Sequence, residues 1–105
     1  VSLNISFKMF LKPDFQSEYF KRHNNIWPEL RALLKKEGIS NYNIFLDEKN
    51  NELFAFLTTS NINYNINLKT NPLMQKWWNY MSDIMICNDD NSPKTENLKQ
   101  VFFLE

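Results

Sequence analysis

The sequence predicts a single α+β domain, on three observations. Segments with an apolar period of two, typical of half-buried strands, alternate along the chain with segments of helical spacing. The length of 105 residues is the usual size of one domain, so residues 1–105 are assigned to one unit. Apolar residues make up 43% of the chain and aromatic residues 15%, which is enough for a packed core.

The first half of the chain predicts one strand and one interrupted helix. Residues 2–11 alternate between apolar and polar side chains, which indicates a strand. A Lys-Pro-Asp segment then ends the strand and starts a helix expected over residues 14–37, with Gly38 as its C-terminal cap. Because proline removes a helical hydrogen bond, the helix should kink or break just before Pro28.

The second half predicts a hairpin, a helix and a last strand. Residues 42–46 and 53–57 read as two strands, and the Asn- and Asp-rich connection between them favours a tight turn. Residues 70–86 have apolar side chains three or four positions apart, which predicts a helix. The apolar run 101–104 predicts the last short strand.

Residues 60–69 fit two structures. Their apolar side chains alternate with asparagines, which by period alone predicts a strand, and Asn is a poor helix former. A helix would instead place the same apolar residues in i,i+4 pairs and complete the order β-α-β-β-α-β. The helix is the favoured interpretation.

The order β-α-β-β-α-β is that of the ferredoxin-like split unit. It gives a four-stranded antiparallel sheet with both helices on one face. The other face would stay uncovered, yet the strand at residues 53–57 has apolar side chains on both faces, such as Leu53 and Phe54. An exposed apolar patch of that size marks an interface, so a homodimer is expected.

Charge and rare residues exclude several classes of function. Twelve Lys and Arg balance twelve Asp and Glu, so no cationic surplus is available for nucleic acid. One cysteine (Cys87), one glycine (Gly38) and one histidine (His23) exclude internal disulfides, Gly-rich phosphate loops and His-His metal pairs. We therefore expect no metal and no cofactor.

No apolar run approaches the roughly 18 residues that a membrane helix needs. The first eleven residues have neither a basic start nor a small-residue cleavage site, so no signal peptide is predicted. A lone cysteine suits a reducing compartment. These features predict a cytoplasmic protein without a membrane partner.

His23 is the candidate for proton transfer, because imidazole alone titrates near neutrality when unperturbed. It lies one helical turn from Tyr19 and one from Trp27, although a partly buried structural histidine is an equally good interpretation. Trp77 and Trp78 fit either core and interface positions or an aromatic wall for a sugar.

Longer strings carry a more specific signal. Residues 19–30 read Tyr-Phe-Lys-Arg-His-Asn-Asn-Ile-Trp-Pro-Glu-Leu, and residues 77–83 read Trp-Trp-Asn-Tyr-Met-Ser-Asp. With Asp-Asn-Ser-Pro at 90–93 and Val-Phe-Phe-Leu at 101–104, they resemble the L-rhamnose mutarotase family in order and spacing. Asn25 stands where that family commonly has Pro.

The resemblance implies a dimeric α+β barrel and an isomerase of carbohydrate metabolism. It assigns the catalytic proton donor to His23 and sugar contacts to Tyr19, Tyr42, Trp77 and Trp78. The implied reaction interconverts the α and β anomers of L-rhamnose: His23 protonates the ring oxygen as the ring opens and takes the proton back on closure. Tyr19, Asp83 or a water would take the second proton.

Three alternatives stay open. The sugar could be another deoxyhexose such as L-fucose, with the same acid and different hydroxyl partners. The fold also suits a cofactor-independent oxygenase acting on an aromatic substrate. A non-catalytic sugar-binding dimer would bind the sugar without speeding anomer exchange.

Overall fold

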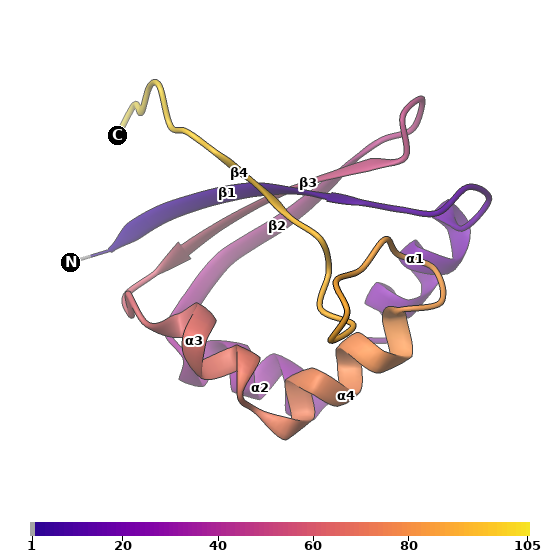
Figure 1. Cartoon of the computed structure of the whole chain (residues 1–105). Coiled ribbons are helices and arrows are strands. Elements are labelled where there is room, and N and C mark those ends of the chain that lie inside the picture. Colours follow the sequence, from indigo (N-terminus) through magenta and orange to yellow (C-terminus); the bar gives the residue numbers. More distant parts are fainter. Residues whose placement is uncertain (1) are drawn as a thin grey trace.

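The computed structural model describes residues 2–105, which form four strands and four helices (Figure 1). In chain order these are β1 (Leu3–Phe10), α1 (Gln16–Asn24), α2 (Pro28–Lys36), β2 (Ile39–Asp47), β3 (Glu52–Thr59), α3 (Tyr64–Lys69), α4 (Pro72–Met81) and β4 (Glu96–Leu98). The strands make one antiparallel sheet in the order β2-β3-β1-β4. The predicted α+β class and four-stranded antiparallel sheet are confirmed.

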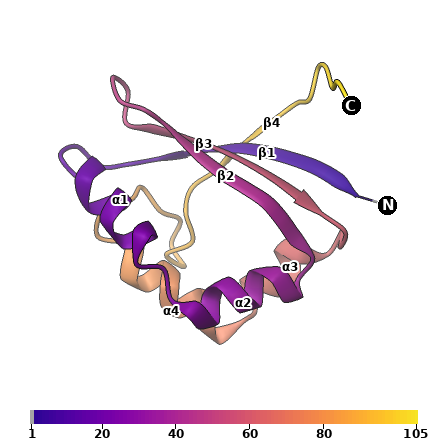
Figure 2. The ribbon, with the colours of Figure 1, turned by 180° about the vertical axis from the view of Figure 1, so that it is seen from behind.

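All four helices lie on one face of the sheet, and no described helix covers the other (Figures 1 and 2). The alternation in β3 decides which side chains face the helices. Leu53, Ala55 and Leu57 are buried in the core, whereas Phe56 between them is exposed on the opposite face. The predicted apolar character of both faces is confirmed.

The helix predicted over residues 14–37 is two helices. α1 ends at Asn24, and Trp27 adopts an extended backbone (φ −62°, ψ 130°) before Pro28 opens α2. Gly38 follows the last residues of α2 with a φ of +82°, the left-handed conformation that glycine adopts freely. The predicted break and the predicted cap are both confirmed.

The favoured helix within residues 60–69 is also confirmed, as α3. The Asn61 side chain accepts a hydrogen bond from the Asn63 backbone N–H at 3.0 Å, which turns the chain out of β3. Leu68 is buried against the core, whereas Ile62 and Ile66 stay exposed. The i,i+4 pairing of isoleucines therefore buries neither of them.

The helix predicted over residues 70–86 begins near the expected position and ends early, at Met81. Asn71 caps its start by accepting a hydrogen bond from the Leu73 backbone N–H at 2.9 Å. Ile84 and Met85 continue the apolar pattern because they are buried beneath the sheet, not because they are helical. Periodicity alone cannot separate these two causes.

The strand predicted at residues 101–104 is wrong. β4 covers Glu96–Leu98 instead and pairs with β1, with Ser6 opposite Leu98. The free edge of β1 offers backbone partners to this polar segment, whereas the four apolar residues that follow are exposed and form no strand. The apolar character of residues 101–104 predicted a strand, but no described strand pairs with them.

Candidate functional site

Tyr19 and His23 lie one turn apart on α1 and contact each other. Their rings stack with centroids 4.2 Å apart and planes inclined by 28°. Nδ1 of His23 lies 3.1 Å from the backbone carbonyl oxygen of Tyr19. Because a carbonyl only accepts hydrogen bonds, we assign the imidazole proton to Nδ1, which leaves the lone pair on Nε2.

Burial sets the charge of His23. Burial lowers the pKa of the imidazole below its ordinary 6.5, and the hydrogen bond to the Tyr19 carbonyl opposes this only in part. The ring is therefore mostly neutral at pH 7. In this state Nε2 can accept a proton and then donate the same proton elsewhere.

Trp77 of α4 meets the imidazole of His23. The two rings lie edge to face, with centroids 5.6 Å apart and an interplanar angle of 85°. Trp27 approaches Trp77 at 5.0 Å and also stacks on Tyr80 at 5.6 Å. Trp27, Trp77 and Tyr80 thus form one aromatic cluster on the helical side of the sheet, and His23 contacts it through Trp77.

The two adjacent tryptophans have different surroundings. Trp77 is 5% exposed and belongs to the core, whereas Trp78 is half-buried at the margin of the core. Adjacent helical side chains point about 100° apart, which accounts for the difference. Trp78 therefore has more free ring surface for a ligand than Trp77 has.

Tyr42 comes from an irregular part of β2. The pairing of β2 with β3 shifts register between Ser40 and Asn43, and Asn41 takes a φ of +50° there. Tyr42 is 39% exposed, and partial burial raises the pKa of its hydroxyl to about 12.

A third tyrosine belongs to this neighbourhood. Tyr64 of α3 adds to the raised pKa of Tyr42, and Tyr42 adds to the pKa of the buried Tyr19, which burial itself raises most. Tyr42 of β2 therefore interacts electrostatically with Tyr19 of α1 and with Tyr64 of α3. They stay protonated at neutral pH and serve as hydrogen-bond donors and acceptors.

Asp83, which the sequence leaves open as an acceptor of the second proton, is bound by Arg22. The guanidinium donates to both carboxylate oxygens, at 2.8 Å and 3.2 Å. The hydrogen bond from Arg22 holds the pKa of Asp83 below its usual range, which makes that carboxylate a weaker base.

The sequence analysis did not identify three residues of the candidate site, namely Tyr64, Tyr80 and Arg22. Arg22 reaches residues about sixty positions away along the chain, so no local spacing signals the contact. Its place directly before His23 in the matched string is the one signal that could have found it.

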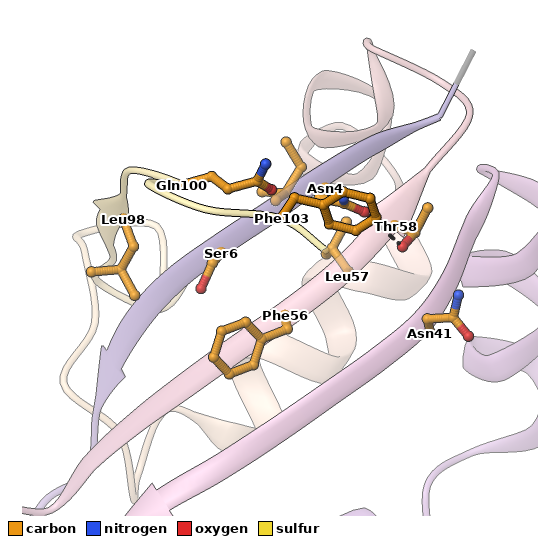
Figure 3. A pocket seen from close by; sticks show the side chains of 10 residues that line it. Asn4, Ser6, Asn41, Phe56, Leu57, Thr58, Leu98, Gln100 and Phe103 are labelled. Atoms are coloured by element: carbon orange, nitrogen blue, oxygen red, sulfur yellow. Dashed lines mark hydrogen bonds between the residues drawn. The ribbon is translucent and has the colours of Figure 1, made fainter. Parts of the chain in front are cut away.

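A cavity of about 220 Å³ lies at the sheet (Figure 3). Strand residues and the C-terminal segment line it, among them Asn4, Ser6, Phe56, Thr58, Gln100 and Phe103. None of the predicted site residues contributes to its lining. The candidate catalytic group and this cavity are therefore distinct.

Within residues 2–105, no three His, Cys, Asp or Glu side chains are grouped as a metal site would require. No helix of that part of the chain is long and apolar enough to cross a membrane.

The chain resembles known proteins over nearly its whole length. A family model described as L-rhamnose mutarotase matches residues 4–104. An L-rhamnose mutarotase of Flavobacterium johnsoniae is 52% identical over 95% of this chain and 94% of its own length. One of Bacteroides thetaiotaomicron is 49% identical over 95% of this chain and 96% of its own length.

Solved structures agree with the sequence matches. The crystal structure of an L-rhamnose mutarotase from Formosa agariphila superposes with a TM-score of 0.91 at 44% identity, covering 98% of this chain and 99% of that one. A protein of Mycobacterium tuberculosis shares the fold alone, with a TM-score of 0.62 at 10% identity over the full length of both chains. The family model and these relatives show that the chain belongs to the L-rhamnose mutarotase family.

Proposed function

We propose that this protein is an isomerase that interconverts the α and β anomers of L-rhamnose by acid–base assisted opening and closing of the pyranose ring. One observation carries the proposal. Nδ1 of His23 donates to the Tyr19 carbonyl, Nε2 has no hydrogen-bond partner among residues 2–105, and the ring lies beside the aromatic cluster of a chain that belongs to this family.

Ring opening moves one proton between two oxygens on the same carbon. The anomeric hydroxyl loses its proton and becomes a carbonyl, while the bond from the anomeric carbon to the ring oxygen breaks and the ring oxygen gains a proton. Closure on the other carbonyl face reverses both transfers. Because both oxygens are bound to one carbon, a single nitrogen can serve each in turn.

The charge state of His23 orders these transfers. A neutral imidazole cannot begin as an acid, so Nε2 first takes the proton of the anomeric hydroxyl and then gives it to the ring oxygen. His23 remains the proton donor to the ring oxygen, as the resemblance implies. Tyr19 or a water would help to relay the proton, and Asp83, as a carboxylate paired with Arg22, would accept no proton in the reaction.

The remaining site residues hold the sugar in this proposal. The hydroxyls of Tyr19 and Tyr42 would bind sugar hydroxyls, and the free ring surface of Trp78 would cover the apolar side of the sugar with its methyl group. Trp77 would limit the site from the core side, because so little of its ring is exposed.

The proposal includes a homodimer that closes two sheets into an α+β barrel. Phe45 and Phe56 lie on the uncovered sheet face, 61% and 44% exposed, with ring centroids 5.9 Å apart. Exposed apolar residues at 101–104 add to the surface that no described part of the chain buries. A second copy placed face to face would cover it. We also place the enzyme in the cytoplasm, where a reducing environment suits the free thiol of Cys87.

Exchange NMR on the anomeric protons tests the proposed reaction. The rate of α/β exchange is measured for L-rhamnose with and without protein, beside L-fucose under the same conditions. Faster exchange for L-rhamnose alone is the expected result. Faster exchange for L-fucose alone would keep the reaction and change the sugar, and unchanged exchange for both would exclude mutarotation of either.

A further inference from the structure

We infer that Arg22 is a positioning residue: its side chain joins α1 to the end of α4 and so fixes His23 against the aromatic rings of α4. We call this set of Arg22 contacts the clamp. The inference rests on the proposed function. Arg22 precedes His23 on α1, and its side chain is 10% exposed. No role in sugar binding is assigned to it.

The guanidinium uses its donors on three partners at once. Nε donates to Glu18 of the same helix at 2.8 Å. One terminal nitrogen donates to the backbone carbonyl of Tyr80 at 2.9 Å and, with the other, grips the Asp83 carboxylate in a two-point contact. Such a fork fixes both distance and orientation, which a point charge does not.

The contacts of Arg22 stabilise the C-terminal end of α4. The last turn of α4 holds no basic residue of its own, and the Tyr80 carbonyl lies in that turn, where the helix ends before it can supply an N–H partner. Arg22 supplies both a donor and a positive charge there, and its guanidinium carbon lies 4.5 Å from the centre of the Tyr80 ring. Tyr80 and Trp77 belong to the aromatic cluster that contacts His23, directly in the case of Trp77.

The consequence is geometric. α1 presents His23 to Trp77, and Arg22 is the neighbouring residue that ties the same stretch of α1 to the end of α4. A shift between the two helices would move Nε2 relative to a sugar held beside α4. Misplacement by about 1 Å is enough to cost on the order of 10²-fold in rate.

Arg22→Lys is the test, because it keeps the charge and the long stem while losing the fork. We expect kcat for L-rhamnose to fall by about 10- to 100-fold with KM within about twofold, in a protein that stays folded by circular dichroism. Arg31→Lys, on the exposed surface of α2, is the matched control and should change neither constant.

The ring signals of His23 give a readout that does not depend on activity. Since the chain has one histidine, its imidazole nitrogens are assigned without ambiguity. We expect them to shift in Arg22→Lys and to stay in place in Arg31→Lys. A folded Arg22→Lys protein with unchanged kcat and unchanged ring signals would overturn the inference.

Asp83→Asn covers the case in which Arg22→Lys does not fold. This change keeps the shape of the acceptor and removes its charge, while the contacts of Arg22 with Glu18 and Tyr80 remain. We expect a smaller fall in kcat and a smaller shift of the ring signals, and no change in either would count against the clamp. If the wild-type protein exchanges no sugar, the proposed function fails, and the ring signals still decide whether Arg22 positions His23.

Discussion

The two faces of the sheet are both rich in aromatic side chains, yet they are built differently. Beneath the sheet, the rings of His23, Trp77 and Trp27 meet partners from other helices at 5.0 to 5.6 Å. On the uncovered face, Phe45 and Phe56 meet each other and remain largely exposed. The first group is packed by other residues of the same chain, whereas no described residue covers the second group.

The difference separates two uses of the same residue type. Aromatic rings that are packed from several sides, with a hydrogen bond fixing the imidazole, provide the fixed geometry that proton transfer needs. Rings on an open face can instead bury area against any complementary surface. The proposed function therefore places the chemistry on the helical face and the assembly on the open face.

His23→Asn should give the largest change on the helical face. The amide keeps a polar group of similar size but cannot take up a proton, so kcat for L-rhamnose should fall by about 10²- to 10⁴-fold with little change in KM. Asn24→Ala, at the exposed end of α1, is the control. Full activity in a folded His23→Asn protein would remove His23 from the reaction.

Trp77→Ala and Trp78→Ala should distinguish a ring that stabilises the core from a ring that binds the sugar at its margin. Removing the buried Trp77 ring leaves a cavity, so the free energy of unfolding should fall by about 3–5 kcal/mol. Trp78→Ala should cost less stability and raise KM more, because the Trp78 ring is only half-buried. Urea unfolding and steady-state kinetics measure both. Equal losses of stability would contradict the division between the two rings.

Phe56→Glu should weaken dimer formation through the open face of the sheet without altering the candidate site. In a symmetric dimer the charge enters the interface twice, and burial of one such ring is worth about 1.5–3 kcal/mol, so dimer affinity should fall at least about 10²-fold. Sedimentation velocity over a concentration series measures it. Ile62→Glu, exposed before α3, should leave the assembly unchanged. A wild-type protein that is monomeric throughout would refute the assignment of this face.

The smallest effect concerns pH. Because the pKa of His23 is lower in the folded chain than in the unfolded one, the unfolded chain binds more protons between those two values. The His23 contribution to stability is therefore complete above pH 6.5 and is lost as the pH falls through the folded-state pKa.

Urea unfolding at several pH values measures this slope, and subtraction of the slope in His23→Asn isolates it from the carboxylates. The proton-accepting role also predicts that kcat/KM falls as the pH drops below the same pKa. An NMR titration that placed the pKa of folded His23 above 6.5 would contradict the stability slope and would move the fall in kcat/KM to higher pH.

Local features of the chain could be predicted from the sequence because they depend on local chemistry. Pro28 breaks the helix wherever that helix packs, and Gly38 ends it because the left-handed backbone there favours glycine. Tyr19 and His23 belong to one helix, so their contact follows from spacing.

Features that depend on distant partners could not be predicted in this way. The position of β4 depends on the free edge of β1, with which it pairs. The end of α4 could not be predicted because buried apolar residues continue the helical pattern beyond it. The Arg22–Asp83 pair and the tyrosine from α3 likewise join segments that only the fold brings together.

The most direct test of the account measures α/β exchange of L-rhamnose by the Phe56→Glu protein, beside wild type and His23→Asn at equal chain concentration. Every residue assigned to the chemistry lies on the helical face of one chain, so the account predicts that the monomeric variant keeps most of its activity per chain while His23→Asn loses it. Loss of exchange in the folded monomer to the level of His23→Asn would contradict the separation of chemistry from assembly.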